Sequence, residues 1–143
     1  MKLLAYNLSK ISHSGQLYGK EDYFLYHIVP IENIVHQKYF KDQYSIVAYL
    51  HDIVEDTDVT LKDINSLFGG AISNSVDAIT RRKNEPWLDY LNRVVLDDVA
   101  KAVKYYDVLF NLEETINQIT MTKDKNNIRR YKKYMQALRV LHP

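Results

Sequence analysis

The sequence has no cysteine, only four glycines and three prolines in 143 residues, and no long apolar run. The absence of cysteine excludes a disulfide framework and a zinc site built on thiolates. Glycine and proline are too sparse to mark a linker, and no internal repeat or low-complexity tract divides the chain. Residues 1–143 are therefore expected to fold as a single compact domain, for which this length is ordinary.

The charge of the chain is almost balanced, with 19 basic residues against 18 acidic ones and a formal net charge of +1. No overall field would attract nucleic acid or an anionic membrane, so bulk nucleic-acid binding is not expected and any phosphate recognition must be local. The first residues meet Asn7, Ser9 and Lys10 too early to form a secretory apolar segment, and no run is long enough to span a membrane. We therefore expect a cytoplasmic protein without membrane segments, and the sequence does not specify its oligomeric state.

Apolar residues recur at helical spacing, and no segment alternates with a period of two over the length of a strand. This pattern predicts an all-α fold, a compact helical bundle. A loop is expected at 13–22, and Pro30 is expected to delay the next helix so that His27 lies just ahead of it. The expected helices cover about 3–11, 29–37, 42–57, 60–69, 70–82, 86–95, 97–112 and 124–141.

A histidine and several acids recur at helical spacing within residues 43–61, where no lysine or arginine occurs. On a helix His51 shares one column with Glu55, and Asp52 shares the next with Asp56. An acidic helix face is ordinarily just solvated surface. Here no basic residue compensates the repulsion among the carboxylates. A bound divalent cation would do so, because such ions take neutral imidazole and ionised carboxylate as ligands.

One helix cannot supply a full coordination shell, so further ligands are needed. Asp107 borders the apolar stripe of its predicted helix, and Asn111 lies one turn further on, where its amide could hold a substrate or a water. The simpler alternative is that Lys104 and Asp107 form a helical ion pair and that Asn111 is a surface amide. His27 follows an aromatic and apolar run that predicts a position near the core, where a lone histidine is more often a hydrogen-bonded core residue than a ligand.

The order His27, His51-Asp52 and Asp107 in a helical chain resembles the metal ligands of the HD superfamily of metal-dependent phosphohydrolases. The sequence HDIVEDT, from His51 to Thr57, is similar to the HDxxEDT segment of the hydrolase domain in RelA/SpoT homologues, which remove the 3′-pyrophosphate of (p)ppGpp. The resemblance extends over nearly the whole chain. Flanking segments in the same order are 13–16, 76–82, 103–107 and 130–134.

The resemblance implies one divalent ion held by these two histidines and two aspartates, with manganese as the preferred metal and iron or zinc as alternatives. Such an ion would polarise a phosphoryl oxygen and lower the pKa of water, while Glu55 and Asp56 would orient the attacking water and handle its proton. Substrate contacts are expected from Asn111, Lys104, Arg81 and Arg82. For each of the three basic residues, the simpler alternative is a solvated surface cation.

The chain departs from the RelA/SpoT pattern where that family contacts its substrate. Leu17 and Tyr18 stand where a basic residue usually follows the Gly-Gln pair, Val108 replaces an arginine, and two glutamates, Glu113 and Glu114, replace an Arg-Thr pair. The expected function is a phosphohydrolase acting on a nucleotide, either (p)ppGpp or a related signalling nucleotide. The alternative is a catalytically weak module that binds a nucleotide or a partner on the same helices.

Overall fold

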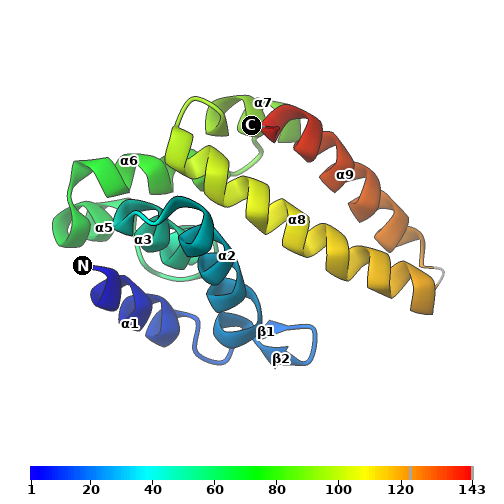
Figure 1. Ribbon diagram of the computed structural model, residues 1–143, viewed down its shortest axis with the longest axis horizontal. Helices are drawn as coiled ribbons and strands as arrows, with labels where there is room; N and C mark the ends of the chain where they lie inside the picture. Colours follow the sequence, from blue (N-terminus) through cyan, green and yellow to red (C-terminus); the bar gives the residue numbers. More distant parts are fainter. Residues whose placement is uncertain (123, 143) are drawn as a thin grey trace.

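A computed structural model describes residues 1–122 and 124–142, most of which are helical (Figure 1). This confirms the predicted all-α class. Pro143, the last residue of the predicted domain, lies outside the described residues. None of the helices described is long and apolar enough to cross a membrane. In chain order the elements are α1 (Lys2–Ser12), β1 (Leu17–Tyr18), β2 (Glu21–Asp22), a π-helical turn η1 (Phe24–Ile28), α2 (Val29–Tyr39), α3 (Asp42–Leu50), α4 (Ile53–Asp56), α5 (Leu61–Phe68), α6 (Gly70–Ile79), α7 (Trp87–Val94), α8 (Asp98–Met121) and α9 (Lys125–Leu141).

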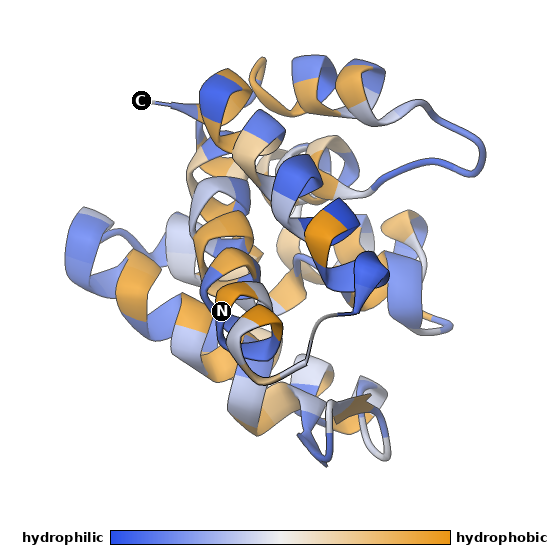
Figure 2. Ribbon diagram, turned by 90° about the vertical axis from the view of Figure 1, so that its right-hand side faces the viewer, coloured by the Kyte–Doolittle hydropathy of each residue, from blue (hydrophilic) through white to orange (hydrophobic). Residues whose placement is uncertain are grey.

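Helix α3 lies at the centre of the fold. Its last six residues, 45–50, are all buried, and it packs against α1, α2, α6 and α8. A helix that is apolar on every side is stable only inside a core, which explains why the apolar run ahead of His51 lies there. Most of the other helices have one hydrophobic and one hydrophilic side in Figure 2, as expected for elements that cover a core.

Helices α8 and α9 pack side by side along the right-hand part of Figure 1. Each begins at an aspartate whose carboxylate accepts a backbone N–H, Asp97 from Ala100 at 2.8 Å and Asp124 from Asn126 at 2.9 Å. Because α9 returns along α8, residues near the end of the chain come close to the middle of α8. This return brings the last helix to the functional site.

The loop expected at 13–22 contains a small antiparallel hairpin in which Leu17 pairs with Asp22 and Tyr18 with Glu21. The sequence does not predict it, because two residues per strand are too few to show alternation. Gly19 takes a φ of +63° in its turn, a conformation in which glycine has no steric penalty. Directly after the hairpin the π-helical turn η1 runs into α2, so that helical structure begins before the predicted start at residue 29 and includes His27.

Two further helix boundaries in the structure differ from the predicted ones. The helix expected over 42–57 is interrupted at His51 and Asp52, between α3 and α4. Helix α6 ends at Ile79 instead of near residue 82, which leaves Arg81 in the loop that follows. Side chains bind the last carbonyls of α6 and so replace a further helical turn: Tyr90 donates to the Ile79 carbonyl at 2.5 Å.

Arg93 of α7 fixes the loop between α6 and α7. Its guanidinium donates to both carboxylate oxygens of Glu85 at 2.9 Å, to the Asp77 carbonyl at 2.8 Å and to the Thr80 carbonyl at 2.7 Å. These bonds to Arg93 hold the pKa of Glu85 at about 2. Arg93 therefore ties the loop that carries Arg81 to α6 and α7.

We expect Arg93→Ala to lower the free energy of unfolding by about 2–4 kcal/mol, because Glu85 loses both bonds to the guanidinium and the Thr80 carbonyl loses its donor. The exposed Arg82–Asp77 pair, 3.4 Å apart, provides the control: Arg82→Ala should cost about 0–1 kcal/mol. Since the pKa of Glu85 is lower in the folded chain, its stabilisation is complete above about pH 4.5 and declines as the pH falls toward 2. Urea unfolding at several pH values measures both effects; equal losses in the two variants would contradict this account.

Candidate metal centre and active-site cleft

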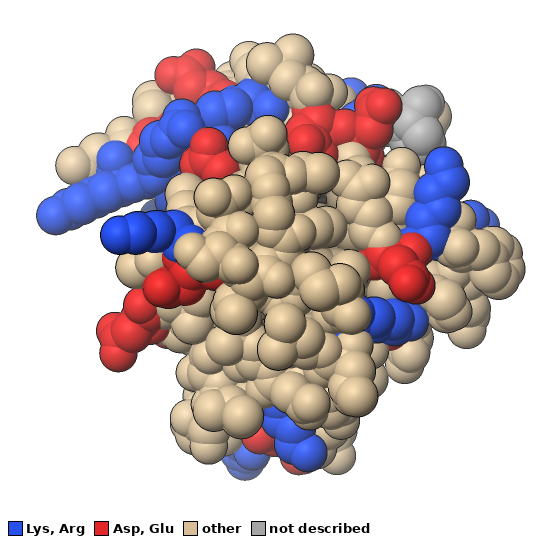
Figure 3. Space-filling view, turned by 90° about the vertical axis from the view of Figure 1, so that its left-hand side faces the viewer, with Lys and Arg blue, Asp and Glu red and all other residues tan. Residues whose placement is uncertain are grey.

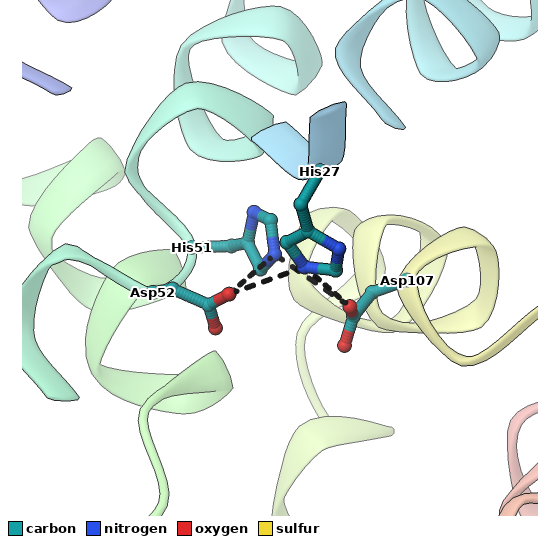
Figure 4. A group of neighbouring side chains, drawn as sticks. All are labelled: His27, His51, Asp52 and Asp107. Carbon is teal, nitrogen blue, oxygen red and sulfur yellow. Dashed lines mark ion pairs between the residues drawn. The ribbon is translucent and has the colours of Figure 1, made fainter. Parts of the chain in front are cut away.

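Four side chains from three parts of the chain meet at one point (Figure 4). His27 comes from η1, His51 and Asp52 from the break between α3 and α4, and Asp107 from the middle of α8. One ligand atom from each lies within 4.8 Å of all the others. The Nε2 atom of His51 is 3.1 Å from the Asp52 carboxylate, and that of His27 is 3.2 Å from the Asp107 carboxylate. The structure thus brings together all four predicted ligands.

The local fold orients the histidines. The Nδ1 atom of His51 donates to the Ala48 carbonyl at 2.7 Å, so that Nε2 is the ring nitrogen that faces the two carboxylates. That Nε2 atom is buried and has no hydrogen-bond partner among the residues described. The π-helical turn, a form often found at functional sites, holds His27 with its ring stacked 4.8 Å from the Tyr18 ring.

The electrostatics of this cluster require a positive charge. Burial raises the pKa of Asp52 and Asp107 on its own, but neighbouring positive groups, His51 for Asp52 and Lys104 for Asp107, hold both pKa values well below the usual range. Burial likewise lowers the pKa of His51, but the carboxylates outweigh it and raise that pKa well above its ordinary value. Two imidazoles and two carboxylates in this arrangement fit a divalent transition metal, which would replace protons on the histidines.

Further polar groups hold the ligands in place. Lys104 donates to one oxygen of Asp107 at 2.8 Å, and the Asn111 amide donates to the other at 2.9 Å. The helical ion pair between Lys104 and Asp107, considered above as the simpler alternative, is therefore present. It is buried, however, and its aspartate is also one of the four candidate ligands. The Tyr23 hydroxyl donates to Asp52. Such contacts fix the direction of each carboxylate.

Glu55 and Asp56, the predicted acid–base residues, both line the cavity beside the cluster. Glu55 accepts the backbone N–H of Arg81, and burial raises the pKa of its carboxyl. Asp56 accepts from the Gln16 amide at 2.9 Å, and Gln16 is in turn bound to Nδ1 of His13 at 2.7 Å. The two acids are thus held by different segments of the chain.

The cavity has a volume of about 240 Å³. Three of the candidate metal ligands, His27, Asp52 and Asp107, form one part of its wall, and the basic residues Arg81, Lys104 and Lys133 form another. Arg82 does not line it and instead lies on the neighbouring surface, paired with Asp77. The wall residues that the sequence analysis did not identify are Tyr18, Tyr23, Trp87, Tyr90, Lys133 and Tyr134.

No family model matches the chain. A curated relative, the guanosine-3′,5′-bis(diphosphate) 3′-pyrophosphohydrolase MESH1 of Danio rerio, is 36% identical over 78 residues, which are 51% of this chain and 43% of MESH1. The bifunctional (p)ppGpp synthase/hydrolase SpoT of Escherichia coli K12 is 27% identical over 77 residues, 54% of this chain and 11% of SpoT. The chain is similar to ppGpp hydrolases. The matches cover less than half the length of these relatives.

Among solved structures, one described as a metazoan orthologue of SpoT that hydrolyses ppGpp superimposes with a TM-score of 0.83. The superposition covers 99% of this chain and 85% of that one, at 21% sequence identity. The chain has the fold of that SpoT orthologue. At 21% identity the superposition shows a shared fold only. The similarity to ppGpp hydrolases comes from the sequence matches.

Proposed function

We propose that this chain is a metal-dependent hydrolase that removes pyrophosphate from (p)ppGpp or a related signalling nucleotide. The observation that carries the proposal is the convergence of His27, His51, Asp52 and Asp107 on one point, with ligand atoms within 4.8 Å of one another. The similarity to MESH1 and SpoT supports the nucleotide as the substrate. Two imidazoles and two carboxylates favour manganese, with iron and zinc as alternatives, over magnesium or calcium.

In this proposal the four ligands hold one divalent ion. When bound, the ion supplies a Lewis acid for a phosphoryl oxygen and lowers the pKa of water. Tyr23 and Lys104 keep Asp52 and Asp107 pointed at the ion through the hydrogen bonds described above.

Glu55 serves as the general base in this scheme and Asp56 as its partner. Water attacks the phosphorus next to the nucleoside 3′-oxygen, and Glu55 takes the proton of that water. The bond from phosphorus to the 3′-oxygen breaks, and the proton passes to that oxygen, so the products are pyrophosphate and the nucleotide with a free 3′-hydroxyl. Desolvation raises the pKa of the Glu55 carboxyl, so this group holds a proton more readily than an ordinary glutamate, as the exchange requires.

The nucleoside end of the substrate has a place beside the cleft. An adjoining pocket of about 430 Å³ shares Tyr18, Asn111 and Tyr134 with the cavity and adds Arg130 of α9. The tyrosine rings offer stacking surfaces, and Arg130 offers a cation for phosphate. A basic residue from the last helix can therefore serve in place of those absent at Leu17 and Val108. On the face shown in Figure 3 the described charged residues lie mainly toward the margins and leave a largely uncharged middle.

Pyrophosphate release tests the proposal. Purified protein with Mn²⁺ and ppGpp should release pyrophosphate, and chelation of the metal with EDTA should abolish release until Mn²⁺ is restored. Chromatography distinguishes pyrophosphate from orthophosphate. If the protein is inert on ppGpp and a panel of related nucleotides, and its melting temperature does not change with Mn²⁺, the binding-module alternative replaces this proposal.

A further inference from the structure

Lys133 of α9 projects into the cavity, where its ammonium lies 4.2 Å from the centre of the Trp87 ring. It is half-buried, and among the residues described it has no hydrogen bond or ion pair. This separates it from the other basic residues of the cavity: Lys104 is paired with Asp107 at 2.8 Å, and the Arg81 guanidinium donates to the Glu85 carbonyl at 2.7 Å.

Three cations surround this one indole ring. The Arg81 guanidinium carbon is 5.5 Å from the ring centre, and the Lys104 ammonium is 6.0 Å from it. Burial lowers the pKa of Lys133, and the charges of Lys104 and Arg81 lower it further. Holding an unpaired ammonium beside two like charges is unfavourable, and a multivalent anion bound between them would relieve the repulsion.

We propose that Lys133, seated on Trp87, binds the terminal phosphate of the pyrophosphate group. This inference rests on the proposed function, because it assumes that the phosphate under attack binds at the metal centre. The cavity wall is acidic at the candidate metal ligands and basic around Trp87. Lys104 lies where the two parts meet, 2.8 Å from Asp107 and 6.0 Å from the Trp87 ring centre. A two-phosphate group would offer one phosphate to each part of the wall.

A purely structural account is that Lys133 only joins α9 to α7 through its cation–π contact. The two accounts predict different outcomes for Lys133→Met, which keeps the aliphatic stem over the ring and removes the charge. A purely structural contact would change the stability of the fold. It would not by itself change the affinity for an anion. A phosphate ligand affects affinity whether or not the stability changes.

Calorimetric titration with inorganic pyrophosphate tests the inference without requiring turnover. Lys133→Met should weaken pyrophosphate binding about 10–100-fold, as expected for a charged hydrogen bond, and Lys133→Arg should restore most of it. Lys132→Met, an exposed neighbour on the same helix, is the matched control and should bind as the wild type does. Trp87 is the chain's only tryptophan, so its fluorescence should also change on pyrophosphate binding.

The outcomes separate this inference from the proposed function. If Lys133→Met binds pyrophosphate as tightly as the Lys132→Met control, the inference is wrong, even if the wild type hydrolyses ppGpp. If binding depends on Lys133 but no nucleotide is hydrolysed, the inference stands and the proposed function fails. In an active enzyme, Lys133→Met should raise KM for ppGpp more than it lowers kcat, since the contact exists before the chemical step.

Discussion

Replacing Asp52 with asparagine is expected to lower kcat/KM for pyrophosphate release by about 10³-fold or more, the largest effect we predict. The variant keeps the shape of the side chain but removes the negative charge that both histidines face, at 3.4 Å from His27 and 3.1 Å from His51. The bound metal should fall in parallel with activity. Steady-state kinetics together with metal analysis of the purified variant measure both quantities.

The control for this variant is Asp77→Asn, which changes an exposed aspartate paired with Arg82. It should leave metal content and activity near the wild-type values. Circular dichroism should show the same helical content for both variants, since Asp52 lies in a break between helices. Full activity in Asp52→Asn would contradict the assignment of this carboxylate as a ligand.

Glu55→Gln is expected to lower kcat by about 10²–10⁴-fold, the range typical for loss of a general base. The metal content and KM should change little, because the metal ligands remain. Burial raises the pKa of the Glu55 carboxyl above 4.5, and a base must be ionised to act. Wild-type kcat should therefore fall as the pH decreases through this raised pKa, and the acidic limb should be absent from the variant.

Glu113→Gln, on an exposed part of α8 away from the cavity, provides the matched control and should keep the wild-type pH profile. A profile of Glu55→Gln that runs parallel to the wild type at all pH values would assign the proton transfer to another group. Asp56, which lines the same cavity, would then be the next residue to test.

Local sequence signals predict most of the helices. Thr60 followed by Asp63 three residues later is a sequence signal for a capping box, and the two residues form one at the start of α5. Asp63 N–H donates to the Thr60 hydroxyl at 3.2 Å, and Thr60 N–H donates to the Asp63 carboxylate at 2.9 Å. Pro86 lies just before α7 as its N-cap, one residue ahead of the predicted position. The hairpin at 17–22, the π-helical turn and the break at His51 are missed, because periodicity averages over windows longer than these features.

The metal cluster could be anticipated from the order of its residues, whereas helical periodicity alone was misleading. A continuous helix would place His51 in one column with Glu55 and Asp52 in the next with Asp56. Instead, α3 ends before His51 and α4 begins at Ile53. Lys133 and Trp87 have no local signal at all. They meet only because α9 folds back over α8 and α7, and contacts set by tertiary packing cannot be identified from one segment.

A crystal grown with Mn²⁺ and measured at a wavelength where manganese scatters anomalously would test the central claim most directly. We predict one strong anomalous peak per chain, about 2.0–2.3 Å from a nitrogen of His27 and of His51 and from an oxygen of Asp52 and of Asp107. A peak elsewhere, or none among these four side chains at saturating Mn²⁺, would contradict the claim.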